Sequence, residues 1–243
     1  MTVWHPYQTE SVTYPDGHKV SWIAQDRAND WPLADGWTFA NWIAKGKEME
    51  KLPLTDSLTQ EIYKYYSMSI NDSAYTEHWS RDQRFALTGL EALSKDTSSV
   101  LSGHVDVGNA MFSGGSYGGT AAAWSLMHDA RVKAAVDFDG TSYFVTRPRD
   151  LAKPYLYFKA LKAEDAHLHA DILFKQTTGR FWELTFNCQH WEFGDSGPLG
   201  IPGIMKKTML AMADEYLKKK GVGLVDAAVS EPGSFTLRKK LYL

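Results

Sequence analysis

A serine near the middle of the chain stands in a Gly-x-Ser-x-Gly pattern, with apolar residues before it and small residues after it. The pattern is typical of a nucleophile elbow, in which a strand leads through a sharp turn into a helix. Such a turn exposes the hydroxyl of Ser116 and directs the backbone N–H of Tyr117 toward a substrate carbonyl oxygen. We therefore predict Ser116 as a nucleophile and the Tyr117 N–H as an oxyanion donor. The alternative is a glycine-rich turn that carries an ordinary serine.

A nucleophilic serine needs a histidine to take its proton, and hydrolases with this elbow have the chain order serine, acid, histidine. His190 lies beyond the serine and comes two residues after a predicted strand, 181–188, so we predict it as the base. His167 and His169 fall in a predicted helix, 163–174, where side chains two positions apart diverge. We therefore expect no metal-binding pair there.

Several carboxylates could orient that histidine. Asp139 ends the predicted strand that follows the elbow helix, and Asp137 lies deeper on the same face of that strand. Glu164 and Asp165 follow the next predicted strand, which is the more usual place for the acid in such hydrolases. Asp195 is close to the histidine in the sequence. The residue pattern leaves Asp139, Glu164 and Asp165 as the main candidates.

Strands and helices that alternate along the chain must position these groups. A turn at residues 15–17 separates two short β segments and predicts a hairpin. The spacing of apolar residues predicts strands at 2–5, 104–112, 132–140, 154–159 and 181–188, and helices at 37–51, 55–68, 73–94, 117–129, 163–174 and 203–220. This alternation predicts an α/β fold with a mostly parallel sheet flanked by helices, in a single domain over residues 1–243.

The composition excludes several classes of protein. The net charge of −3 provides no basic field, so we expect no nucleic-acid partner. Cys188 is the only cysteine, which excludes an intrachain disulfide and a cysteine-based zinc site. The sequence has no phosphate-binding loop, dinucleotide fingerprint or zinc-protease motif, so we expect no cofactor and no metal. No segment is apolar for long enough to span a membrane, and the first residues lack a signal-peptide pattern, so we expect a cytoplasmic protein.

Two segments resemble the type II platelet-activating-factor acetylhydrolases and their fungal relatives. In the first, a Phe-Asp-Gly sequence places Asp139 23 residues after the serine, as in that family. In the second, residues 189–195, the family's H-x-x-F-x-D motif is matched by His190, Phe193 and Asp195.

The resemblance implies an α/β-hydrolase fold with Ser116, Asp139 and His190 as the triad. It also implies that a short acyl ester of a phospholipid-like alcohol is hydrolysed through an acyl-enzyme. The partner is then a small-molecule or lipid ester. Nine tryptophans, most of them in the first third of the chain, serve either as core anchors or as an apolar patch that contacts lipid at the membrane surface.

Two departures from the family matter. Gly115 stands where the family has a histidine, directly before the nucleophile. Residues 5–7 and 14–17 resemble the family's segment after its fourth strand, so we expect the first strands to be absent, together with the loop that supplies the second oxyanion donor. Losing one donor typically lowers turnover roughly 100- to 1,000-fold. Three alternatives follow: residues 26–50 supply the donor, the chain is an impaired remnant that acts as a binding protein, or it transfers acyl groups to an alcohol.

Overall fold

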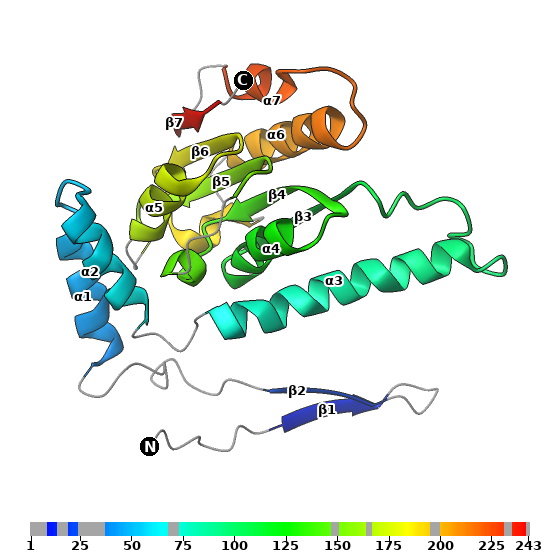
Figure 1. The fold of residues 1–243 in the computed structure, drawn as a ribbon, viewed down its shortest axis with the longest axis horizontal. Helices are drawn as coiled ribbons and strands as arrows, with labels where there is room; N and C mark the ends of the chain where they lie inside the picture. Colours follow the sequence, from blue (N-terminus) through cyan, green and yellow to red (C-terminus); the bar gives the residue numbers. More distant parts are fainter. Residues whose placement is uncertain are drawn as a thin grey trace.

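Five strands form one sheet in the computed structural model (Figure 1). They are Ala110–Gly115 (β3), Val132–Phe138 (β4), Tyr155–Ala160 (β5), Phe181–Phe186 (β6) and Phe235–Lys240 (β7). The strands β3 to β6 are parallel neighbours in chain order, and β7 joins β6 in the antiparallel direction. The structure describes residues 9–13, 19–23, 37–67, 73–146, 151–163, 167–194, 200–230 and 235–241. The predicted α/β fold, a mostly parallel sheet flanked by helices, is confirmed.

Seven α-helices lie within these described ranges. They are Phe39–Met49 (α1), Asp56–Ser67 (α2), Ser73–Lys95 (α3), Tyr117–His128 (α4), Leu168–Gln176 (α5), Ile201–Tyr216 (α6) and Leu224–Val229 (α7). The predicted helices correspond to α1 to α6. The helix α7 and the strand β7 are additions to the prediction. The predicted hairpin is confirmed as Thr9–Thr13 (β1) paired antiparallel with Lys19–Ile23 (β2), whereas the predicted strand at 2–5 lies outside the described residues.

The strand before the serine is shorter than predicted, because residues 104–109 form turns instead of a strand. The carboxylate of Asp106 accepts hydrogen bonds from the backbone N–H of Gly108 (3.2 Å) and from the side-chain amide of Asn109 (2.7 Å). An aspartate that binds the backbone two residues ahead favours a turn over an extended strand. The strand β3 therefore begins at Ala110.

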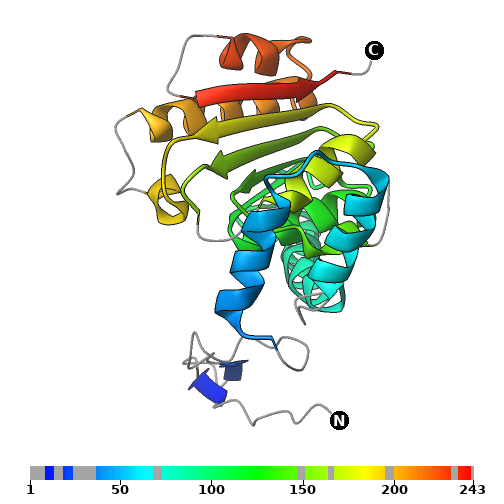
Figure 2. The ribbon, with the colours of Figure 1, turned by 90° about the vertical axis from the view of Figure 1, so that its left-hand side faces the viewer.

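The sheet separates two apolar cores, and Figure 2 shows the sheet with the helices beside it. Side chains alternate between its faces, so Tyr155 and Tyr157 of β5 point toward α4 and α5, whereas Leu156 and Phe158 point toward α6 and α7. The first core continues into α1 and α2, where the ring of Trp42 stacks on the ring of Tyr65 with centroids 4.4 Å apart. The helices α1, α2 and α3 are thus packed on the side of the sheet that carries the elbow helix.

The long helix α3 holds the elbow helix α4 through a polar contact. Glu77 accepts hydrogen bonds from the indole N–H of Trp124 (2.6 Å) and from Arg84 (2.7 Å). Partial burial opposes ionisation of Glu77, but these hydrogen bonds more than offset it and lower its pKa to about 2. Beside this contact, the hydroxyls of Ser80 and Ser125 lie 2.8 Å apart. The position of α4 is therefore fixed by specific polar contacts as well as by apolar packing.

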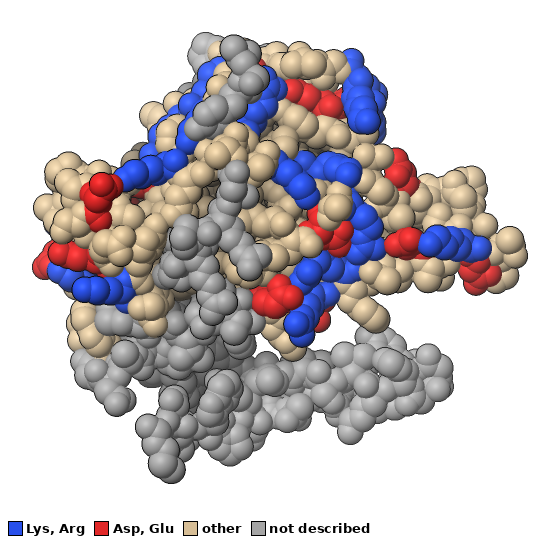
Figure 3. Space-filling model, in the orientation of Figure 1, with Lys and Arg blue, Asp and Glu red and all other residues tan. Residues whose placement is uncertain are grey.

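The surface carries both signs of charge. On the face shown in Figure 3, basic and acidic side chains are interspersed. Ion pairs among the described residues include Arg131 with Asp129 at 2.7 Å and with Glu91 at 3.0 Å. Within the described part of the chain, no helix combines the length and the apolar character needed to cross a bilayer.

Close contact between β3 and α4 depends on glycine. A Cβ atom placed on Gly114 would lie 2.7 Å from the backbone nitrogen of Gly119 and would overlap the backbone of Gly118. A Cβ atom on Gly119 would overlap the carboxylate of Asp137, which lies beneath the turn. By contrast, a Cβ atom on Gly115 would meet no atom within 4 Å in the described structure. Position 115 therefore has room for a Cβ atom, whereas positions 114 and 119 do not.

This difference between neighbouring glycines predicts opposite effects on stability. Gly114→Ala should lower the free energy of unfolding by about 1–3 kcal/mol, because helix backbone must move to admit the methyl group. Gly115→Ala, which serves as the matched control, should leave stability unchanged or raise it by about 0.4–1 kcal/mol, because alanine restricts the unfolded chain. Urea unfolding followed by circular dichroism measures both. Equal destabilisation by the two substitutions would contradict the packing described above.

Candidate active site

Ser116 occupies the turn between β3 and α4, so the strand, turn and helix predicted around it are confirmed. Its backbone has φ 53° and ψ −129°, and its side chain is exposed. Its N–H donates to the carbonyl oxygen of Phe138 on β4 (2.9 Å), and its own carbonyl accepts from Gly119 N–H (3.0 Å). A non-glycine residue at such a φ costs about 1–3 kcal/mol and persists only where surrounding contacts impose it. The hydroxyl therefore stands on a strained, tightly held turn.

Tyr117 is the first residue of α4, where the positive end of the helix dipole lies. Its phenol oxygen lies 3.0 Å from the hydroxyl of Thr76 on α3. Its ring contacts the ring of Trp79 edge-on, with centroids 5.2 Å apart. These side-chain contacts fix the backbone of Tyr117, which is the predicted oxyanion donor.

Asp139 follows β4 directly, next to the serine turn. The parallel register pairs Gly115 on β3 with Phe138 on β4. The residues that follow this pair, Ser116 and Asp139, therefore leave the sheet at the same level. The backbone N–H of Asp139 donates to Phe158 on β5 (2.8 Å), and its φ is 59°. Only glycine fits at position 140, because a Cβ atom there would overlap the carbonyl oxygen of Ser116. The serine and the acid therefore share one edge of the sheet.

His190 lies in a short 3-10 helix, His190–Phe193 (η2), that follows β6. Its Nδ1 is 2.8 Å from Oδ2 of Asp139, and its side chain is 39% exposed. An ionised carboxylate can only accept hydrogen bonds, so Nδ1 carries a proton and Nε2 is the basic nitrogen of the neutral ring. The Phe193 ring anchors η2 against Phe158 and Phe186 in the core. The structure thus brings Asp139 and His190 together in the orientation that a general base requires.

The other predicted acids differ in their placement. Asp137 is fully buried and accepts hydrogen bonds from the Gly140 N–H (2.7 Å) and from the Tyr155 hydroxyl (2.8 Å). Burial raises the pKa of Asp137, and the negative charge of Asp139 raises it further. These contacts give Asp137 a structural role beneath the turn. Glu164, Asp165 and Asp195 lie outside the described residues.

A second histidine reaches Asp139 from the opposite side, and sequence reasoning missed it. Nε2 of His167 is 2.8 Å from Oδ1 of Asp139. The prediction placed His167 inside a helix, but α5 begins one residue later, at Leu168. The available signal was its position after β5, because the carboxyl ends of parallel strands meet at one edge of the sheet.

The two imidazoles determine the charge state of Asp139. Burial alone would raise the pKa of this carboxyl, since its side chain is only 1% exposed. Hydrogen bonds from His167 and His190 more than offset the burial and hold the pKa below its ordinary value. The carboxylate therefore stays ionised and able to orient an imidazolium.

Cys188, two residues after β6, lies close to this site but is fully buried. Burial raises the pKa of its thiol to about 11, and the negative charge of Asp139 contributes in the same direction. Within the described ranges, no three His, Cys, Asp or Glu side chains gather as a metal-binding group. The chemistry available at this edge is that of a hydroxyl, two imidazoles and a carboxylate.

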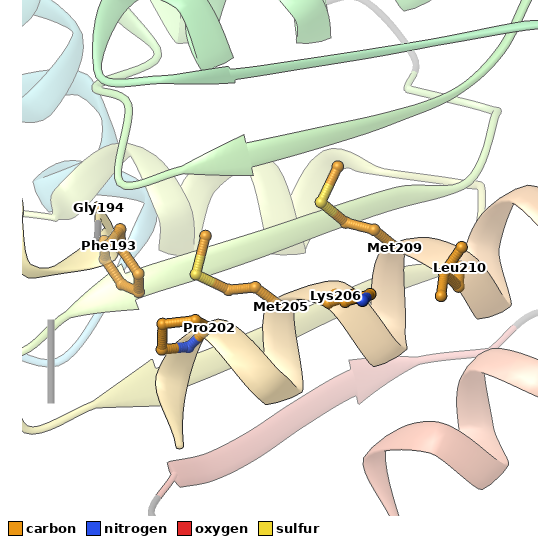
Figure 4. A pocket seen from close by; sticks show the side chains of 7 residues that line it. All are labelled: Phe193, Gly194, Pro202, Met205, Lys206, Met209 and Leu210. Atoms are coloured by element: carbon orange, nitrogen blue, oxygen red, sulfur yellow. The ribbon is translucent and has the colours of Figure 1, made fainter. Parts of the chain in front are cut away.

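A shallow apolar groove of about 390 Å³ runs from η2 along α6 (Figure 4). Phe193 and Gly194 line its end nearest to His190, and Pro202, Met205, Lys206, Met209 and Leu210 line the rest. The two methionines are partly buried, whereas Leu210 is 53% exposed. The groove gives an apolar chain a place to lie beside the histidine turn.

Comparison with known proteins gives a structural likeness only. No protein-family model matches the sequence, and no curated protein matches it. Among solved structures, a ferulic acid esterase from Streptomyces cinnamoneus is similar, with a TM-score of 0.48 and 21% identity. The match covers 66% of this chain and 53% of that one, so the chain spans about half the length of the structure that it matches.

The strain at Ser116 predicts a gain in stability when glycine replaces it. Ser116→Gly should raise the free energy of unfolding by about 0.5–2 kcal/mol, because relief of the backbone strain exceeds the entropy lost by glycine on folding. Ser116→Ala, which retains a Cβ atom, should leave stability close to that of the unchanged protein. Thermal and urea unfolding of both variants measure the difference. A glycine variant no more stable than the alanine variant would show that the turn is unstrained.

Proposed function

We propose that this protein is a serine carboxylic ester hydrolase, with Ser116 as the nucleophile, His190 as the base and Asp139 as the acid that orients it. The observation that carries the proposal is the 2.8 Å contact between Asp139 and Nδ1 of His190, at the sheet edge where the strained Ser116 turn exposes a hydroxyl. A base held by a carboxylate beside such a turn is the arrangement used in acyl transfer.

The reaction proceeds in two stages. In the first, His190 takes the hydroxyl proton while the oxygen of Ser116 attacks the ester carbonyl, and the Tyr117 N–H stabilises the negative oxygen that forms. The imidazolium, oriented by Asp139, then gives its proton to the departing alcohol, which leaves an acyl-enzyme. In the second stage, His190 activates water, and the acid is released with the serine restored.

For the substrate, we propose a short acyl ester of a phospholipid-like alcohol. The resemblance of residues 189–195 to the platelet-activating-factor acetylhydrolases supports this class. The apolar groove along α6 supports it independently, because a groove lined by methionines accepts flexible apolar chains. Lys206 on the same groove would suit an anionic group attached to such a chain.

Hydrolysis of p-nitrophenyl acetate tests the reaction. The protein should release p-nitrophenol with a burst, and Ser116→Ala should lower kcat/KM at least about 1,000-fold, because the covalent step is removed. Ser113→Ala is the matched control, since Ser113 is an exposed serine on β3, and it should retain activity. Equal background rates for the protein and for Ser116→Ala would instead favour the non-catalytic binding protein.

The groove predicts a dependence on chain length. Met205→Gln should lower kcat/KM for the acetate ester of a long-chain alcohol roughly tenfold and leave kcat/KM for p-nitrophenyl acetate unchanged, because only the long alcohol chain reaches the groove. Val222→Gln, at an 87% exposed position outside the groove, is the control and should affect neither ester. An equal loss of kcat/KM with both esters after Met205→Gln would show that the groove does not bind the chain of the substrate.

A further inference from the structure

Asp139 is held between two imidazoles, and only one of them takes part in the reaction proposed above. His190 contacts Oδ2 at 2.8 Å, and His167 contacts Oδ1 at 2.8 Å. We propose that His167 is a positioning residue that, together with Glu50 behind it, fixes the orientation of the Asp139 carboxylate toward His190. This inference rests on the proposed function and adds two residues to the site.

The division of the carboxylate oxygens is the first reason. Oδ1 accepts from Nε2 of His167 and from the Ala160 N–H (2.7 Å), whereas Oδ2 faces the imidazole of His190. The last side-chain torsion of aspartate has a broad, roughly two-fold preference, so the carboxylate plane is not fixed by its own geometry. Two donors on one oxygen fix that plane and leave the second oxygen pointing at the reacting histidine.

Glu50 in turn holds His167. Its Oε1 accepts the backbone N–H of His167 (3.1 Å) and lies 3.8 Å from the ring Nδ1. Because the Asp139 carboxylate only accepts, Nε2 of His167 carries a proton, and Nδ1 is the nitrogen directed to Glu50. Burial opposes ionisation of Glu50, but the hydrogen bond from the His167 backbone and the charge of Lys47 lower its pKa. An anion therefore faces the outer side of the imidazole ring.

Burial makes these contacts strong. The His167 side chain is 5% exposed and the Asp139 side chain 1%, compared with 39% for His190. In a poorly hydrated site, hydrogen bonds to an ion are stronger than in water, and an unmatched charge is costly. The chain from Glu50 through His167 to Asp139 thus links the end of α1 to the edge of the sheet where Ser116 stands.

The neighbouring His169 offers a matched comparison. It is also buried, but its ring nitrogens contact the hydroxyls of Tyr157 (3.1 Å) and Tyr66 (3.4 Å) instead of Asp139. Replacement of either histidine removes a buried imidazole from the same segment. Only replacement of His167 removes a donor from the carboxylate.

Loss of that donor also changes the dependence on pH. The hydrogen bond from His167 lowers the pKa of Asp139, so its loss raises that pKa and lets Asp139 take up a proton at higher pH. A carboxylate with one donor fewer also attracts the protonated imidazole of His190 more strongly, so the acidic limb of kcat/KM, which requires that imidazole to be neutral, should move to higher pH. The titratable and charged groups around the pair of His167 and Asp139 are Glu50, Asp137, Tyr157, Lys159, His169, Cys188 and His190.

Four variants of the full chain test the proposal with p-nitrophenyl acetate. His167→Leu should lower kcat roughly 10- to 100-fold with KM unchanged, because the base is misoriented while substrate binding is intact. His167→Gln should recover most of the loss, since its amide can donate to Oδ1. Glu50→Gln should move the acidic limb of kcat/KM to higher pH, as His167→Leu does, but by a smaller amount. His169→Leu should leave the pH profile of kcat/KM where it is.

The outcomes separate this proposal from the proposed function. A His167→Leu variant with unchanged kcat and pH profile, or one that matches His169→Leu in both, overturns the positioning role. If the unchanged protein shows no esterase activity, the ring N–H proton of His190 is observed by NMR instead. A shift of that resonance in His167→Leu supports the contact chain without catalysis, and an unchanged resonance overturns it. If His167→Leu does not fold, Glu50→Gln carries the comparison: a pH profile moved to higher pH supports the positioning role, and an unchanged profile overturns it.

Discussion

A buried carboxylate that must stay charged is the constraint on which the arrangement of this site depends. An ion taken out of water is costly unless hydrogen bonds replace its hydration. Asp139 meets that requirement with one backbone N–H, from Ala160 on β5, and with two imidazoles. The donors come from three separate places along the chain, so the carboxylate is satisfied only when β5, the start of α5 and η2 all stand in position.

A second constraint is the close approach of backbone segments under the turn. Glycines at 114, 119 and 140 let β3, α4 and the end of β4 come nearer than any side chain would permit. Asp137 occupies the space they leave, and its hydrogen bonds to the Gly140 N–H and to the hydroxyl of Tyr155 connect β4 to β5. The exposed hydroxyl of Ser116 thus rests on a buried polar layer, which keeps the turn rigid while its outer side faces solvent.

The sequence predicted those parts of the fold that local chemistry determines. The alternation of strands and helices followed from apolar spacing, and the Ser116 turn followed from its glycines. The strand β7 was missed because Arg238, Lys239 and Lys240 give it the composition of a surface segment. Its pairing depends on partners far away in the sequence, such as Asp171 and Glu183, which bind Arg238 at 2.5 Å. The helix α7 has only six residues, too few for a periodic pattern to be evident.

The candidate site was predictable to the extent that chain order constrains it. Order alone selected His190, but it left several acids open, and the family resemblance favoured Asp139. His167 was assigned to a helix because apolar residues around it have helical spacing. A tertiary contact with Asp139 decides where that helix begins, and no local pattern contains this information.

The state of the lone cysteine has a practical consequence for chemical probing. Cys188 is covered by the core, and its sulfur remains protonated at neutral pH because its pKa is about 11. Thiolate is the reactive form of cysteine, so an electrophile that reaches the edge of the sheet meets no competing thiolate from Cys188. Covalent adducts formed there at neutral pH then report on the chemistry of other side chains without prior blocking of the thiol.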